Sequence, residues 1–149
     1  MILAAAGMGV LCVGFKAAAL GLFCLGAAQI ERDWRARNVG FHGGIGARWR
    51  RALDFYSATH LDPMNRILHL VGIPLIVGGA GGLLVTAPIL GPLRLASLGA
   101  FGVGWLLNLL GHTAFEKRAP AFSEDALSFL AGPAWDLGQL LGFARRRAG

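Results

Sequence analysis

The chain has 149 residues, of which 55% are hydrophobic and only 15% are charged, and its mean hydropathy is +0.58. Soluble domains carry nearer a quarter of charged residues, so this composition argues against an ordinary soluble domain and favours an integral membrane protein. The net charge of +6 does not indicate nucleic-acid binding, because the basic residues cluster between apolar stretches and no recognition motif accompanies them.

Three stretches are long enough to cross a bilayer, which requires about 20 apolar residues. Residues 1–30 contain Lys16 as their one charge, and residues 70–93 and 95–115 contain no Lys, Arg, Asp or Glu. The sequence therefore predicts an all-α integral membrane helical bundle with about three transmembrane helices and additional interfacial or re-entrant helices. Residues 1–30 are expected to be a transmembrane or signal-anchor segment, since no small-residue cleavage motif precedes the arginines.

The basic residues predict an orientation for this bundle. Arginines are frequent between the first and second apolar stretches, and basic residues also follow the third, but Arg94 alone lies between the second and third. The positive-inside rule then places the two basic segments in the cytoplasm, and the Arg94 turn and the N-terminus outside. We expect a bacterial inner membrane, with the arginines near anionic head groups. Residues 31–50 read as a basic, glycine-rich linker before a membrane domain at 51–149.

Local signals mark the elements of that domain. Residues 51–59 are expected to form an interfacial helix. Asp62 and Pro63 predict a helix start, because aspartate caps free N–H groups and proline at the first position lacks the N–H that would go unpaired. That helix should run through His69 into the membrane, with a kink at Pro74. A last helix is expected from Ser123, interrupted at residues 132–133. Closely spaced glycines predict a helix-packing face at Gly78, Gly79, Gly81 and Gly82.

Ionisable side chains lie at the ends of the apolar stretches, where such groups are costly and usually functional. They are His60, His69, His112 and Glu116. The pairs Asn65/His69 and His112/Glu116 are each four residues apart, so each pair shares a helix face, and the predicted topology brings both to the cytoplasmic boundary. Imidazole with carboxylate suits iron, zinc, copper or nickel, and the lack of a nearby cysteine excludes a thiolate site. Asp62, Asn65 and Asn108 are candidates for orienting the ring N–H groups.

Other interpretations of the histidines stay open. Histidines at helix ends are also common interfacial hydrogen-bonding residues, which is consistent with a non-catalytic membrane protein. Two facing histidines could instead hold haem for electron transfer. A zinc hydrolase is a further alternative, although no hydrolytic motif accompanies the histidines. His42, in the glycine-rich segment, is expected to be an ordinary exposed residue.

Two blocks of residues carry a family resemblance. The first is Phe55-Tyr56-x3-His60-x2-Pro63-x-Asn65-Arg66-x2-His69-x2-Gly72-Ile73-Pro74, and the second is Trp105-x5-Gly111-His112-x2-Phe115-Glu116-Lys117-x2-Pro120-Ala121. Together they resemble the small membrane proteins typified by the yeast 2-hydroxy fatty acid dioxygenase. The resemblance covers about residues 51–143, and the first 45 residues lie outside it.

The resemblance implies an iron(II)-dependent enzyme that shortens a 2-hydroxy fatty acid by one carbon with O2. It implies that His60, His69 and His112 carry the Fe(2+). Glu116 and Asn65 match the motif and are candidate catalytic residues, with Glu116 a fourth ligand or a base beside the metal; these roles are inferred from position. The expected partners are a 2-hydroxy fatty acid or related lipid, O2 and the lipid bilayer.

Overall fold

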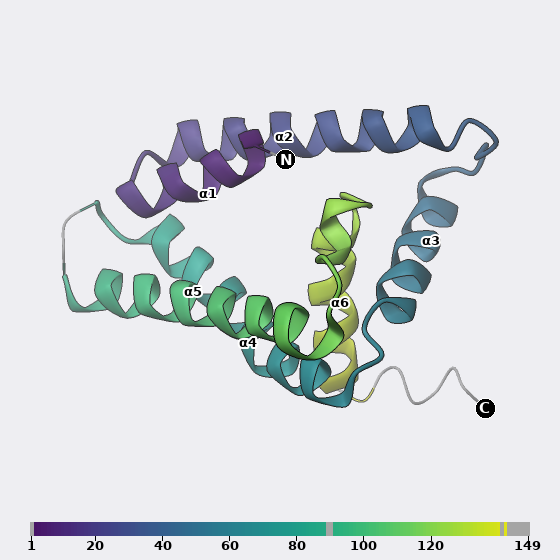
Figure 1. The fold of residues 1–149 in the computed structure, drawn as a ribbon. Helices are drawn as coiled ribbons and strands as arrows, with labels where there is room; N and C mark the ends of the chain where they lie inside the picture. Colours follow the sequence, from purple (N-terminus) through teal and green to yellow (C-terminus); the bar gives the residue numbers. More distant parts are fainter. Residues whose placement is uncertain (1, 89–90, 141, 143–149) are drawn as a thin grey trace.

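The computed structural model describes residues 2–88, 91–140 and 142, and its regular elements are all helical (Figure 1). No strand occurs among these residues, which confirms the all-α fold class. The elements in chain order are α1 (Ile2–Val13), α2 (Lys16–Arg37), α3 (Ile45–Ala58), α4 (Pro63–Val85), α5 (Pro92–Leu110), the π-helix η1 (Gly111–Glu116), the 3-10 helix η2 (Ala121–Ser123) and α6 (Ser128–Leu140).

Two helices in the described part of the chain are long and apolar enough to cross a membrane, namely Pro63–Val85 and the continuous helix Pro92–Glu116 that α5 and η1 form. They correspond to the second and third predicted spans and lie side by side (Figure 1). The predicted start of α4 is confirmed, because Asp62 Oδ1 accepts hydrogen bonds from the N–H groups of Met64 at 2.8 Å and Asn65 at 3.0 Å. The helix continues through Pro74.

The transmembrane or signal-anchor segment predicted for residues 1–30 is not confirmed as a third span, because two helices, α1 and α2, cover these residues. The chain reverses at Gly14, whose φ of +110° favours glycine, and α1 and α2 pack antiparallel as a hairpin. A Cβ on Gly7 would lie 2.8 Å from the carbonyl oxygen of Ala19, so the helices approach very closely. One glycine in an apolar run gives no strong turn signal, and the sequence therefore did not reveal the reversal.

The turn of this hairpin lies beside the α4–α5 turn. A Cβ on Gly14 would lie 2.6 Å from Cβ of Pro88, and Arg94 donates a 2.7 Å hydrogen bond to the carbonyl of Cys12. Both ends of the hairpin therefore lie away from that turn, and a single crossing of the membrane by residues 1–30 is not confirmed. Helix α2 runs on to Arg37, and α3 begins at Ile45, so helices occupy much of the segment expected to be a linker.

Glycines allow α4 and α5 to pack closely. A Cβ on Gly79 would lie 2.5 Å from the backbone N of Phe101, and one on Gly104 would lie 2.6 Å from the carbonyl oxygen of Gly72. The predicted packing face is therefore correct for Gly79, and also for Gly82, which contacts Ser97. The remaining two glycines of the predicted face are exposed with no atom within 4 Å of an added Cβ, namely Gly78 and Gly81.

Neighbouring glycines of α4 should respond in opposite ways to alanine. We expect Gly79→Ala to destabilise the protein by about 1–3 kcal/mol, because the added methyl meets backbone atoms of α5 that cannot yield. Gly78→Ala should be neutral or stabilising by about 0.5–1 kcal/mol, since it adds helix propensity in open space. Thermal unfolding of both variants in one detergent measures the difference, and equal midpoints would contradict the close α4–α5 contact.

Candidate metal centre

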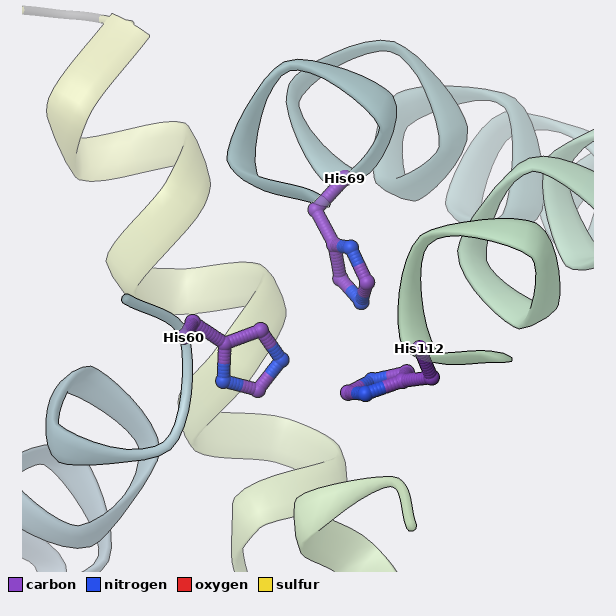
Figure 2. A group of neighbouring side chains, drawn as sticks. All are labelled: His60, His69 and His112. Carbon is purple, nitrogen blue, oxygen red and sulfur yellow. The ribbon is translucent and has the colours of Figure 1, made fainter. Parts of the chain in front are cut away.

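Three histidines from separate elements meet at one end of the α4–α5 pair (Figure 2). His60 lies on the connection between α3 and α4, His69 in the second turn of α4, and His112 in η1. Their ring centroids are 4.8–4.9 Å apart, and one ligand atom of each lies within 4.8 Å of the others. All three are buried, with exposed fractions of 3–4%. Such a group could hold a metal ion.

Hydrogen bonds orient two of these rings. Nδ1 of His60 lies 2.8 Å from the carbonyl oxygen of Tyr56, and Nδ1 of His69 lies 2.9 Å from that of Asn65. Each carbonyl accepts a hydrogen bond from the Nδ1–H of its histidine, which leaves the Nε2 lone pair free, as in metal-binding histidines. Burial lowers the pKa of His60 to about 3, so this ring is neutral at physiological pH.

Two buried histidine nitrogens that lack a hydrogen-bond partner indicate whether a metal ion would fit this site. Among the residues that the structure describes, Nε2 of His60 and Nδ1 of His112 are enclosed and have no hydrogen-bond partner. An unpaired buried polar atom is costly, and a bound cation would satisfy it. Three neutral imidazoles suit zinc, copper, iron or nickel. Three protein ligands also leave coordination positions open, as catalytic sites do and closed structural sites do not. The donor set therefore fits a transition metal.

Glu116 is placed near the histidines but is not one of the grouped ligands. Its Oε1 accepts the N–H of Leu61 at 3.1 Å, and its Oε2 accepts the N–H of Asp62 at 3.1 Å and Nδ2 of Asn65 at 2.8 Å. The carboxylate thus joins η1 to the start of α4. Asn65 is fully buried, and its own carbonyl orients His69. In this arrangement, both residues hold the ligand-bearing segments together.

Tyr56 and Asp136 support His60, and the sequence did not single out this support. The Tyr56 ring stacks on the His60 ring at 3.8 Å, and the Tyr56 hydroxyl donates a 2.6 Å hydrogen bond to Asp136 of α6. The Tyr56 ring also packs on Gly132, where a Cβ would lie 2.5 Å from Tyr56 Cε2. The hydrogen bond joins residues 80 positions apart, which explains why local sequence patterns could not reveal it.

The buried Asp136 should give the fold a pH dependence. Burial raises the pKa of this carboxyl from 3.8 to about 6, against the hydrogen bond from Tyr56, which lowers it. The folded state therefore holds the proton more tightly than the unfolded state. The stabilisation that comes from this tighter proton binding is full below pH 3.8 and is lost as the pH rises through about 6. We expect Asp136→Asn to reduce the change of the unfolding free energy with pH between 3.8 and about 6, as measured by denaturation at several pH values. The same pH dependence in the variant and in the unmodified protein would show that Asp136 is not its cause.

An apolar cavity of ≈300 Å³ opens from the histidines. It follows α4 from His69 to Leu84 and is lined on other sides by α5, α6 and the α1–α2 hairpin. Asn108 adds a polar group near the histidines, and its buried Oδ1 has no partner among the described residues. The histidine rings lie edge to face at 78–89° and in direct contact, so no two of them leave a flat slot for a porphyrin. This geometry argues against the bis-histidine haem alternative.

Comparison with known proteins places this arrangement in a family. A family model described as "2-hydroxy-palmitic acid dioxygenase Mpo1-like" matches residues 47–143, which include all three histidines and Glu116. Searches of curated proteins and of solved structures gave no match. The matched region spans well over half of the chain and leaves the α1–α2 hairpin outside it. The chain therefore belongs to this Mpo1-like family.

Proposed function

We propose that this protein is an iron(II)-dependent membrane dioxygenase that shortens 2-hydroxy fatty acids by one carbon. The observation that carries the proposal is the group of three buried histidines at the end of an apolar cavity. The family description supplies the reaction class and the kind of substrate. The protein donor set alone suits several metals, so the choice of iron follows from the dioxygenase family.

The cavity suits a fatty acid whose polar end lies at the histidines. Its walls beyond His69 are almost entirely apolar, including Ile73 and Ile76 of α4. A carboxylate and the adjacent hydroxyl would occupy positions that the three histidines leave open at this end of the cavity. The chain would then lie along α4, away from water.

The proposed reaction is balanced without an external reductant. A 2-hydroxy acid and one O2 give the acid shorter by one carbon, one CO2 and one water, so the C1–C2 bond breaks and the substrate supplies all four electrons. Iron(II) would supply the activation of O2. His60, His69 and His112 would hold the ion, and the apolar walls would position the substrate and exclude water.

We further propose that Glu116 and Asn65 position the histidines. Glu116→Gln should weaken metal affinity about 10–100-fold, because an amide group cannot accept from the N–H groups of Leu61 and Asp62 through both of its heavy atoms. The control is Glu124→Gln, since Glu124 is half exposed and pairs with the exposed Arg118. Metal titration with thermal unfolding as a second readout separates a positioning role from a loss of stability. Unchanged metal affinity in Glu116→Gln would overturn that role.

We propose that the metal centre lies at the cytoplasmic side of a bacterial inner membrane. The two apolar helices support a membrane location, and the histidines lie where α4 begins and η1 ends, near the basic residues Arg66, Lys117 and Arg118. The orientation is tested by labelling intact cells with one cysteine introduced at the exposed Lys117 or at the opposite Pro88, after Cys12 and Cys24 have been replaced by alanine. Outside labelling at Lys117 would reverse it.

The decisive test of activity uses full-length protein purified without oxygen and loaded with iron(II). Addition of a 2-hydroxy fatty acid and O2 should give the acid shorter by one carbon, with one O2 consumed and one CO2 released per product. The same protein loaded with zinc should give no product. Stoichiometric iron without turnover on any 2-hydroxy fatty acid would refute the proposed reaction, and failure to bind any metal would favour the non-catalytic alternative.

A further inference from the structure

The α1–α2 hairpin forms the end wall of the cavity that begins at the histidines. Leu11 and Ala19 of the hairpin pack with Leu83 of α4 in one buried cluster, and Leu11 and Ala19 also line the cavity. The exposed fractions of these residues are 9%, 3% and 0%, so the wall is well packed. The hairpin lies outside residues 47–143, which the family model matches, so the family resemblance does not account for this wall.

Buried arginines fix the hairpin at both ends. At its turn, Arg94 donates to the carbonyl of Cys12 at 2.7 Å, and Gly14 lies against Pro88. Toward the end of α2, Glu31 accepts from Arg48 of α3 at 2.9 Å. Between these points, Phe23 of α2 packs on Phe129 of α6, with ring centroids 5.3 Å apart. A wall held in this way stays at a fixed distance from the histidines.

The distance from the histidines to this wall suits one long acyl chain. The cavity is lined from His69 to Leu84, which are 15 residues apart on α4, so it follows about 22 Å of helix at 1.5 Å per residue. One leaflet of a bilayer, which is filled by one layer of acyl chains, is about 15 Å deep. The cavity is therefore long enough for the acid group to lie beside the histidines and for a long saturated chain to extend from there to Leu11 and Ala19.

We propose that the α1–α2 hairpin sets the chain length of the fatty acid that this site accepts. This inference rests on the proposed function, since it takes the histidine end of the cavity as the place of the acid group. A chain that reaches Leu11 and Ala19 gains the most buried contact. A shorter chain loses about fourfold in affinity for each methylene that is missing, and a longer chain collides with the wall.

Binding of a homologous series of saturated 2-hydroxy fatty acids to full-length protein in lipid nanodiscs tests this inference. The measurement is made without O2, so it does not depend on turnover. Ala19→Leu fills the end of the cavity and should shift the preferred chain length down by about two carbons, with at least a tenfold loss for the original optimum. Leu11→Ala should shift the optimum up by about two carbons.

Matched controls separate this effect from a general loss of stability. Leu25→Ala changes the same hairpin at a site that is 62% exposed and lines no described cavity, so its preferred chain length should be that of the unmodified protein. Ala80→Leu narrows the cavity from α4, beside the cluster of Leu11, Ala19 and Leu83, and should also favour shorter chains. An identical optimum in the Ala19, Leu11 and Leu25 variants would overturn the role of the hairpin. Failure of the unmodified protein to bind any member of the series would instead overturn the proposed substrate, and the hairpin role with it.

Discussion

His69→Ala is expected to abolish stoichiometric metal binding, and with it any metal-dependent turnover. The ring it removes is one of three buried imidazoles and is oriented by a hydrogen bond to the carbonyl of Asn65, so no other described side chain can replace it. Two remaining imidazoles would bind a divalent ion far more weakly than three. Metal analysis of purified protein after equilibration with iron(II), and separately with zinc, measures the loss.

His42→Ala is the matched control for this experiment, because His42 is exposed and lies on the α2–α3 connection, away from the three histidines. This variant should retain the full metal content. Equal metal content in His69→Ala and in the unmodified protein would show that the ion lies elsewhere, and the proposed reaction would lose its centre. Thermal unfolding of both variants in the absence of metal measures any separate loss of stability, since His69 is buried and His42 is exposed.

Arg48→Met should produce the largest loss of stability among single substitutions outside the metal centre. The guanidinium is 98% buried, binds both oxygens of Asp125 and the carboxylate of Glu31, and lies 3.7 Å from the ring centroid of Trp34. Its removal leaves Asp125 buried without a cation, which costs about 3–5 kcal/mol. Chemical denaturation in a mild detergent measures the free energy of unfolding.

Two further proteins identify the cause of that loss. Arg50→Met removes an exposed arginine from the same helix and should change the unfolding free energy by no more than about 0.5 kcal/mol. The double variant Arg48→Met with Asp125→Asn should recover part of the stability, because the uncompensated buried charge is gone. A double variant as unstable as Arg48→Met alone would show that packing on Trp34, and not the ion pair, carries the effect.

Arg48 also shows where the sequence interpretation was incomplete. The arginines before the second apolar stretch were expected to face lipid head groups, but Arg48 is buried and joins α3 to acidic residues of α2 and of the η2–α6 connection. Similarly, Arg94 was expected to lie in an external turn, and it is buried against the carbonyl of Cys12. These partners are 17, 77 and 82 positions distant, so only tertiary packing brings them together.

More of the candidate site than of the surrounding fold could be predicted from the sequence. Helical spacing and the antiparallel pairing of two apolar helices were sufficient to bring His69 and His112 to one level, and the cap at Asp62 located the start of α4. His60 could be assigned only by its position before that helix. The role of Glu116 could not be deduced, because spacing places a carboxylate near the histidines without showing which N–H groups it meets.

The hydrogen bond between Tyr56 and Asp136 has a consequence for the order in which the centre is assembled. His69 and His112 come together once α4 and α5 have paired, but His60 lies on a connection and is supported by the Tyr56 ring, which packs on Gly132 and bonds to Asp136. Because a chain is synthesised from its N-terminus, the third histidine is fixed only after most of α6 has emerged. A newly made chain would therefore pass through a stage with two placed histidines, and tight binding of the proposed metal would follow the docking of the last helix.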